Sequence, residues 1–303
     1  MVPTAAELVE RLPRPLRRHR LMTAWMRLTG EPPIQLVRIR DDSHGYADMS
    51  DGFLRLIPIE GGFEADFFHV ADSFLQDQGG VFMDVGANFG LLSFGLAGRH
   101  GDRIDFHLFE PNPALVDTIR RTHALFPEMR LNLVAAAVSD RDGTVRLEIN
   151  KEQTGASHIS KTGGLEVPAI TLDGYIGEHG VERVGLLKLD VEGFELAALR
   201  GAEESLRNRV IQAVYFEYFE KNLIRFGPPG ELISFLDEAG FTTCFCRPCD
   251  YDPRGGATRT LAEGLPGHGL DLLPAQGHTL PAMTDLLAVP REALVRLPAR
   301  RDA

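Results

Sequence analysis

The sequence predicts an α/β protein built around a doubly wound, mostly parallel sheet with helices on both faces. From residue 80 onward, short apolar runs alternate with amphipathic stretches of helical length. The segment VFMDVGANFG (81–90) puts glycines directly between a strand and a helix, and the same alternation resumes after residue 184. Strands that alternate with helices in this way indicate βαβ units and a parallel sheet.

The individual elements follow from hydrophobic periodicity and turn residues. The expected strands are 80–85, 103–110, 130–138, 184–191, 209–218, 241–247 and 284–290. The expected helices are 64–77, 88–100, 112–126, 192–206 and 230–240. Two further strands, 144–150 and 165–172, flank a polar, glycine-rich insertion at 151–164, and 250–282 is expected to be a long loop.

The N-terminal part is expected to form an extension (1–62) ahead of a Rossmann-like domain (63–303). Residues 5–28 predict one or two helices broken near Pro13 and Pro15, and 34–60 predict short strands. The first 30 residues contain six arginines against two glutamates. The helix therefore either packs on the domain through its apolar stripe or contacts an acidic partner or a membrane surface. The stripe would comprise Leu8, Leu12, Leu21, Met22 and Trp25.

Composition narrows the function classes. The 303 residues carry a formal net charge of -11, and the chain beyond the basic N-terminus is more acidic still, so nucleic acid is an unfavourable partner. No apolar run approaches the ~18 residues of a membrane span, and no signal-peptide pattern opens the chain. Three cysteines cannot form a complete disulfide framework, so we expect a cytoplasmic protein.

The glycine loop and an acid on the next strand predict a nucleoside site. Glycines after a parallel strand let the backbone approach a ligand, and the following helix N-terminus favours anionic groups. Gly86 and Gly90 form G-x-x-x-G, which is not the dinucleotide fingerprint. Glu110 ends the next strand, where a carboxylate can accept both hydroxyls of a ribose. With Asp84 beside the loop, a nucleoside with a zwitterionic, cationic tail fits best, namely S-adenosylmethionine. Ser139 and Asp140 end the third strand, and Asp140 is a candidate for the adenine amino group.

The segment LLKLDVEGFELAALRGA (186–202) is the more specific signal. Lys188 lies in an apolar strand and needs a partner, because an unpaired buried ammonium is costly. Asp190 shares its strand face, and Glu217 on the next predicted strand is a further candidate partner.

With FMDVGANFG, FEPNP, AAVSDRDG and TLDGYI, this segment makes the chain resemble the FkbM-type S-adenosylmethionine-dependent methyltransferases over roughly 79–220. The resemblance implies a class I, seven-stranded Rossmann-like fold. It also implies O-methylation of a carbohydrate, glycolipid or polyketide-type product, since Asp-Val-Glu-Gly replaces the N-P-P-Y motif used on nucleobase amines. The residues that would hold the cofactor are Asp84, Gly86, Ala87, Asn88, Gly90, Glu110, Pro111 and Asn112.

Asp190 is the first candidate for the base that removes the acceptor proton. Its alternative role is a salt bridge with Lys188, and Glu192 could instead serve as a first-turn helix acid. His158, in the insertion, could reach over the crevice. Asp190, Glu192 and Glu217 could cluster around Mg²⁺ or Ca²⁺, but nothing in their spacing requires a metal, and none is expected. Cys244, Cys246 and Cys249 lack a fourth zinc ligand at regular spacing, with only the distant His268 or His278 to add, and are expected to pack as apolar residues.

Two other functions stay open at this point. One is a nicotinamide-dependent oxidoreductase on a related fold, against which the missing glycine of the fingerprint argues. The other is a non-catalytic cofactor-binding or scaffold module, against which intact Lys188, Asp190 and Glu192 argue. Neither the acceptor nor the oligomeric state can be read from the residues.

Overall fold

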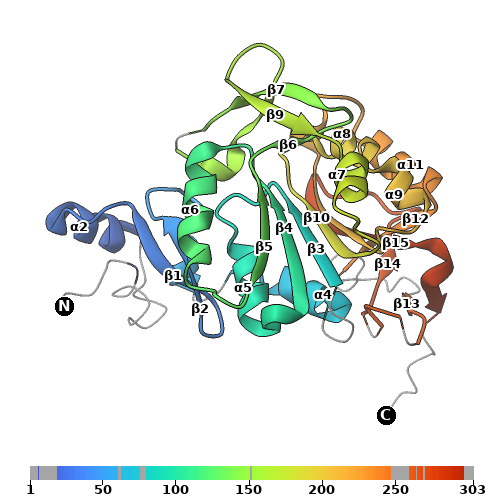
Figure 1. Cartoon of the computed structure of the whole chain (residues 1–303), viewed down its shortest axis with the longest axis horizontal. Helices are drawn as coiled ribbons and strands as arrows, with labels where there is room; N and C mark the ends of the chain where they lie inside the picture. The colour runs from blue at the N-terminus through green and yellow to red at the C-terminus, as the bar shows by residue number, and fades with distance from the viewer. Residues whose placement is uncertain are drawn as a thin grey trace.

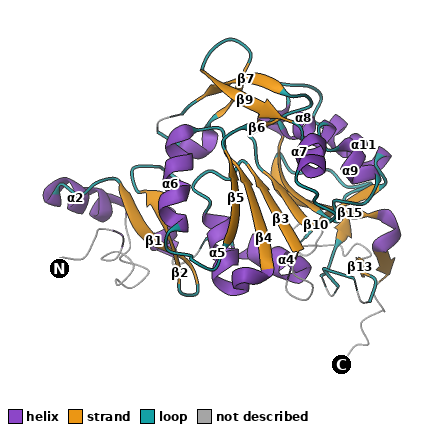
Figure 2. Ribbon diagram, viewed as in Figure 1, coloured by secondary structure: helices purple, strands orange, loops and turns teal. Residues whose placement is uncertain are grey.

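The computed structural model describes residue 6 and residues 19–60, 63–75, 80–150, 152–246, 259–263, 265–268 and 270–296. Within these residues one large sheet forms the centre of the molecule, with helices on either side of it (Figure 1, Figure 2). No helix in the described ranges is long and apolar enough to cross a membrane.

The central sheet confirms the predicted α/β architecture. Its strands run in the order β14-β12-β15-β11-β10-β3-β4-β5. The five strands from β11 to β5 are parallel, and β15 is antiparallel to both β11 and β12. The seven expected strands are all present, and the two-residue β14 adds an eighth at the edge. Their bounds are Gly80–Val85 (β3), Ile104–Phe109 (β4), Arg130–Val134 (β5), Val184–Leu189 (β10), Val214–Phe219 (β11), Phe241–Phe245 (β12), Leu273–Pro274 (β14) and Met283–Pro290 (β15).

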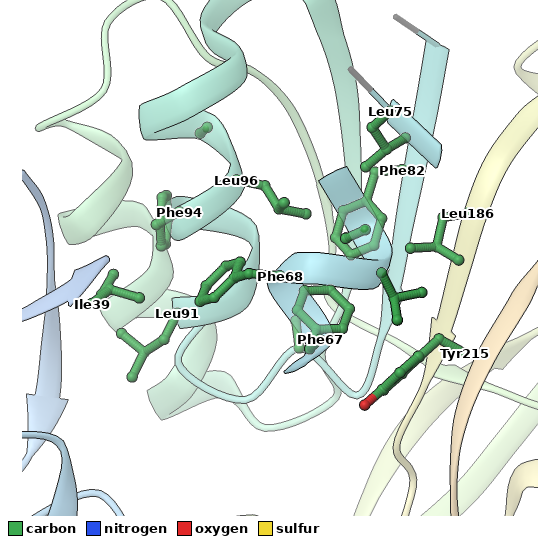
Figure 3. Packing of buried hydrophobic residues seen from close by; sticks show 14 of the residues in the cluster. Ile39, Phe67, Phe68, Leu75, Phe82, Leu91, Phe94, Leu96, Leu186 and Tyr215 are labelled. Atoms are coloured by element: carbon green, nitrogen blue, oxygen red, sulfur yellow. The ribbon is translucent and has the colours of Figure 1, made fainter. Parts of the chain in front are cut away.

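Helices cover both faces because neighbouring residues of a strand point to opposite sides. In β3, Phe82 packs with α4 (Ala65–Leu75), α5 (Leu91–His100) and α6 (Pro113–His123). The next residue, Met83, packs with α7 (Leu172–Glu178), α8 (Glu195–Arg200), α9 (Glu203–Arg207) and α11 (Gly230–Glu238). Figure 3 shows the first of these cores, where Phe67 of α4 lies between Phe82 and Tyr215, with ring centroids 6.0 and 5.3 Å away.

The N-terminal extension shares the first core. The hairpin of β1 (Ile34–Arg40) and β2 (Ser43–Asp48) inserts Val37 and Ile39 beside α5 and α6. Ahead of it, α2 (His19–Thr29) lies beyond the hairpin at the edge of the molecule (Figure 1). Trp25 of α2 packs against the core, as expected for a docked helix, while Leu28 is 84% exposed. The rest of the predicted N-terminal helix, including Pro13 and Pro15, lies outside the described residues.

One expected N-terminal strand is wrong. Residues 52–59 form a turn and the short helix α3 (Leu56–Glu60). Asp51 determines this, because its Oδ1 accepts hydrogen bonds from the backbone N–H groups of Phe53 and Leu54 at 2.8 and 3.2 Å. A side chain that satisfies these donors starts a helical turn rather than a strand.

The insertion builds a second, four-stranded sheet in the order β6-β9-β7-β8, stacked at one end of the main sheet (Figure 1). The predicted pair appears as β7 (Gly143–Glu148) and β9 (Leu165–Ile170), joined by the unpredicted β8 (His158–Ser160) and the 3₁₀ turn η3 (Thr154–Ala156). The strand expected at 130–138 is divided in two: β5 ends at Val134 in the main sheet, and β6 (Ala137–Val138) pairs with β9 in the second sheet.

The C-terminal segment is less irregular than expected. Besides β14, the described part of 250–282 contains β13 (Arg259–Leu261), which pairs with β16 (Leu294–Arg296) beyond the 3₁₀ turn η4 (Arg291–Ala293). Helix α10 (Glu220–Leu223) follows β11 directly. Cys244 and Cys246 are free thiols whose pKa values are raised by burial, as expected of packed cysteines, and Cys249 lies outside the described residues.

Candidate active site

The loops after β3 and β4 are joined through the backbone. The N–H groups of Gly86 and Ala87 donate to the carbonyl of Phe109 at 3.0 and 3.1 Å. Gly86 has φ +77°, and a Cβ there would lie 1.9 Å from the carbonyl oxygen of Asp190. Only glycine fits this position, and the bare backbone lines a pocket at the carboxyl ends of the strands.

Glu110 forms part of the wall of this pocket. Its Oε1 and Oε2 accept hydrogen bonds from the backbone N–H groups of Asn112 and Asn88, each at 2.8 Å. Burial raises the pKa of the Glu110 carboxyl to about 7, although these two hydrogen bonds lower it in part. Each carboxylate oxygen keeps a free lone pair, so Glu110 can accept two further hydrogen bonds from a ligand.

The pocket also carries an unsatisfied acceptor. Asn88, at φ +53°, has a buried side-chain Oδ1 with no hydrogen-bond partner in the described part of the chain. A buried polar atom at a pocket wall without a partner is costly unless a ligand supplies a donor. The pocket thus offers close access to the backbone at Gly86, free lone pairs on Glu110 and the unpartnered Oδ1 of Asn88. Together these features suit a nucleoside, whose hydroxyls can donate hydrogen bonds to the oxygens.

Not every predicted cofactor residue reaches this pocket, which we call the cofactor pocket. Asp84 is buried, with Oδ2 2.7 Å from the Ser93 hydroxyl and Oδ1 facing Lys188. It therefore supports the site through Lys188 and does not line the pocket itself. Asn112 caps α6 through Ala114, and Gly90 ends the loop at φ +71°. Ala87 lines the neighbouring pocket instead. Pro111 and His158 do line the cofactor pocket, whereas Ser139 and Asp140 do not, and the apolar residues just before them take that place: Ala136, Ala137 and Val138.

Lys188 is held at the site by two carboxylates and a backbone carbonyl. Its ammonium lies 3.3 Å from Asp84 Oδ1, 3.3 Å from Asp190 Oδ2 and 3.3 Å from the carbonyl of Gly86. Burial by itself would lower the pKa of Lys188, but the two carboxylates outweigh it and raise the pKa above its usual range. The prediction that Lys188 and Asp190 share a strand face is confirmed by this contact.

The turn after β10 presents two acids to the pockets. Glu192 stands in the left-handed region at φ +54°, and its Oε2 accepts a short hydrogen bond from the Asn222 amide. Gly193 follows at φ +101°, where a Cβ would lie 2.4 Å from the carbonyl oxygen of Asn222. The buried Glu195 closes the turn by accepting from the N–H groups of Val191 and Gly193 at 3.1 and 3.2 Å. The motif 188–195 is therefore a rigid turn that holds Asp190 and Glu192 in place.

Asp190, Glu192 and Glu217 gather at one point, with a carboxylate oxygen from each lying within 4.8 Å of the others. Burial and the neighbouring carboxylates raise the pKa of Glu192 to about 7 and that of Glu217 to about 9. Carboxylates this close share a proton or hold a hard cation such as Mg²⁺. Of the two roles that the sequence left open for Glu217, a partner of Lys188 or a member of a cluster with Asp190 and Glu192, the structure shows the cluster.

A larger pocket adjoins the cofactor pocket, and we call it the acceptor pocket. The two share Asn88, Gly155, Asp190 and Glu192. Asn222 and Asp51 also line the acceptor pocket, and neither was singled out from the sequence. No local pattern marks Asn222, since its role depends on the turn of Glu192 folding against α10.

The mostly parallel sheet, the glycine loop after β3, Glu110 at the end of β4 and the acidic turn after β10 are the features expected of a Rossmann-like methyltransferase. The chain matches the methyltransferase FkbM domain family over residues 84–243, more than half of its length. It belongs to that family and is an S-adenosylmethionine-dependent methyltransferase.

The named proteins that this chain resembles share low sequence identity with it. The chain is 27% identical over 197 residues to the 31-O-demethyl-FK506 methyltransferase FkbM of Streptomyces tacrolimicus, covering 54% of this chain and 73% of that protein. It is 25% identical over 170 residues to the 2-O-methyltransferase NoeI of Sinorhizobium fredii, covering 50% and 68%. The hexuronic acid methyltransferase AglP of Haloferax volcanii is 27% identical over 169 residues, covering 55% and 65%. A solved methyltransferase FkbM from Methylobacillus flagellatus is 14% identical, with a TM-score of 0.40, covering 94% of this chain and 58% of that one.

Proposed function

We propose that the enzyme transfers a methyl group to a hydroxyl oxygen of a carbohydrate, glycolipid or natural-product acceptor. The observation that carries this proposal is the position of Asp190, which lines both the cofactor pocket and the acceptor pocket. An acid at the junction of two pockets can take a proton from a group in one while that group attacks toward the other. Two of the relatives named above methylate oxygen, one as a 31-O-demethyl-FK506 methyltransferase and one as a 2-O-methyltransferase, and this supports an oxygen acceptor.

S-adenosylmethionine, when bound, supplies an electrophilic methyl group on a sulfonium. The residues proposed to hold it are Gly86, whose lack of a side chain lets the backbone approach the ligand, Asn88 through its unpartnered Oδ1, and Glu110 through its free lone pairs. The apolar wall of Ala137 and Val138 suits the adenine ring. With the cofactor held by these walls and the acceptor in the adjoining pocket, positioning of the two would supply up to roughly 7 to 11 kcal/mol of the barrier.

Asp190 is the proposed base. The ammonium of Lys188 lies beside its Oδ2, which leaves Oδ1 to accept the hydroxyl proton as the carbon–oxygen bond forms. The proton then passes to Glu192, whose pKa is raised to about 7 by burial and by the neighbouring acids. In the balance, the methyl–sulfur bond would break as the methyl–oxygen bond forms, the cofactor would leave as the neutral thioether S-adenosylhomocysteine, and the acid cluster would gain the hydroxyl proton.

The direct test is to incubate the enzyme with S-adenosylmethionine and a panel of hydroxyl compounds and to measure S-adenosylhomocysteine. Asp190→Asn should bind the cofactor with unchanged affinity but lower kcat by about 10² to 10⁴-fold. Wild-type turnover in this variant would remove Asp190 as the base. Tight cofactor binding without turnover on any acceptor would instead favour a non-catalytic module.

A further inference from the structure

The acceptor pocket is assembled from segments that are far apart in the sequence. The glycine loop and the 188–195 turn supply part of its walls. The other walls come from described residues between 51 and 60 and between 63 and 67, from the insertion around Gly155, from the region of α10, and from β11 and β15. We therefore expect these other walls to contact the acceptor rather than the cofactor.

Part of this pocket is aromatic and apolar. Phe53 is 46% exposed and packs edge-to-face with Phe63, with ring centroids 6.1 Å apart. Met283, the first residue of β15, also lines the pocket and is 58% exposed. Exposed aromatic rings at a pocket provide a flat apolar surface for a ring-shaped ligand.

The charged residues of the pocket are predominantly acidic. Lys188 is already engaged by Asp84 and Asp190, which leaves Lys221 and Arg225, both exposed, as the remaining cations among the lining residues. Against these three cations stand six lining carboxyl groups: Asp51, Glu64, Asp190, Glu192, Glu217 and Asp285. With Glu217 protonated and Glu192 partly protonated near pH 7, the remaining lining carboxylates still outnumber the three cations.

We propose that the acceptor pocket selects a ring compound without acidic groups, which lays its apolar face on Phe53 and Phe63 and is rejected if it carries a carboxylate. This inference rests on the proposed function. A hydroxyl compound meets the acids as hydrogen-bond acceptors, whereas an anion meets them as like charges in a partly desolvated pocket. A repulsive element of this kind discriminates between acceptors that share the same ring. Hexuronic acids are therefore poor ligands for this enzyme.

The test compares phenyl β-glucoside with phenyl β-glucuronide, which differ only in a CH₂OH group against a carboxylate. Binding to the S-adenosylhomocysteine-loaded enzyme is measured by ligand-observed NMR at about 10 mM and about 0.5 M salt. The glucoside should bind at least ~10-fold more tightly at low salt, and the gap should shrink at high salt because screening weakens like-charge repulsion.

Three variants separate the effect of the acidic residues from the effect of the aromatic surface. Glu64→Gln combined with Asp285→Asn should narrow the gap by improving glucuronide binding alone. Phe53→Ala should weaken both ligands by a similar factor. Leu125→Ala, at an exposed apolar residue on the far side of α6, is the matched control and should change neither.

Equal or tighter binding of the glucuronide would overturn the inference, as would the absence of binding by both glycosides. These outcomes are distinct from failure of the proposed methyl transfer, which is measured by S-adenosylhomocysteine formation. An enzyme that prefers the glucoside but methylates no hydroxyl compound would retain the charge selection and lose the proposed function.

Discussion

Asp51 and Thr154, 103 positions apart, are joined by two hydrogen bonds: Asp51 Oδ2 accepts from the Thr154 N–H at 2.7 Å and from its hydroxyl at 2.9 Å. Asp51 is 3% exposed, and its Oδ1 accepts from the N-terminal segment. The pair fastens η3 to the N-terminal extension. Thr154 lines the cofactor pocket and Asp51 the acceptor pocket, so this contact holds the wall between them.

Asp51→Ala should therefore release η3 and weaken both sites. We expect the KM for the acceptor and the Kd for the cofactor each to rise about tenfold, since buried charged hydrogen bonds contribute roughly 1.5–3 kcal/mol. Hydrogen exchange over 152–158 should accelerate. Asp48→Ala, which loses only two local hydrogen bonds from Ser50, is the control. Unchanged exchange in the Asp51 variant would contradict this role.

Glu110→Ala should weaken cofactor binding by a factor of ten or more, about 1.4 kcal/mol, because the ribose hydroxyls lose their acceptors. Isothermal titration calorimetry with S-adenosylmethionine measures this. Asp117→Ala, a nearby exposed acid paired with Arg120, should bind normally. Wild-type affinity in the Glu110 variant would exclude it from the ribose site.

The rate should depend on pH through Glu192. Its carboxyl must be ionised to receive a proton, and its pKa is raised to about 7 by burial, Asp190 and Glu195. We therefore expect kcat to rise as the pH increases through about 7, and Glu192→Gln to lose this rise. A pH profile of kcat that is identical in the variant would show that the proton does not reach Glu192.

Removal of divalent metal should leave activity intact, because Lys188 already neutralises Asp190 and the acid cluster can share a proton. The enzyme is dialysed against EDTA and then assayed with and without added Mg²⁺. Activity that is lost on dialysis and restored by Mg²⁺ would show that Asp190, Glu192 and Glu217 bind a cation.

Asp72→Asn should destabilise the fold by about 2 kcal/mol. Burial would raise the pKa of Asp72, but hydrogen bonds from His100 and Arg40, with the charges of Arg40 and Arg99, lower it from 3.8 to about 2. The stabilisation is thus fully present above pH about 3.8 and is lost as the pH falls toward 2. Denaturant unfolding measures it. Asp105→Asn, whose pairing with Arg130 is largely exposed, should cost at most ~1 kcal/mol.

The sequence by itself determined the alternating sheet, the glycine loop and the acids at its edge. These follow from local periods and turn residues: Lys188 and Asp190 share a face because strand side chains alternate, and Gly86 marks a close backbone approach. The structure shows both features. Lys188 and Asp190 form a 3.3 Å ion pair, and a Cβ at Gly86 would clash with the carbonyl oxygen of Asp190.

Only the tertiary structure decided the rest of the site. The departure of β6 into a second sheet, the Asn222 contact to Glu192 and the Asp51–Thr154 pair all depend on segments that meet after the chain closes. Such contacts produce no periodic pattern in the sequence, because one hydrogen bond between distant residues places no constraint on the residue types beside either of them. The walls of the acceptor pocket are made of these contacts, which is why the residues indicated the cofactor but not the acceptor.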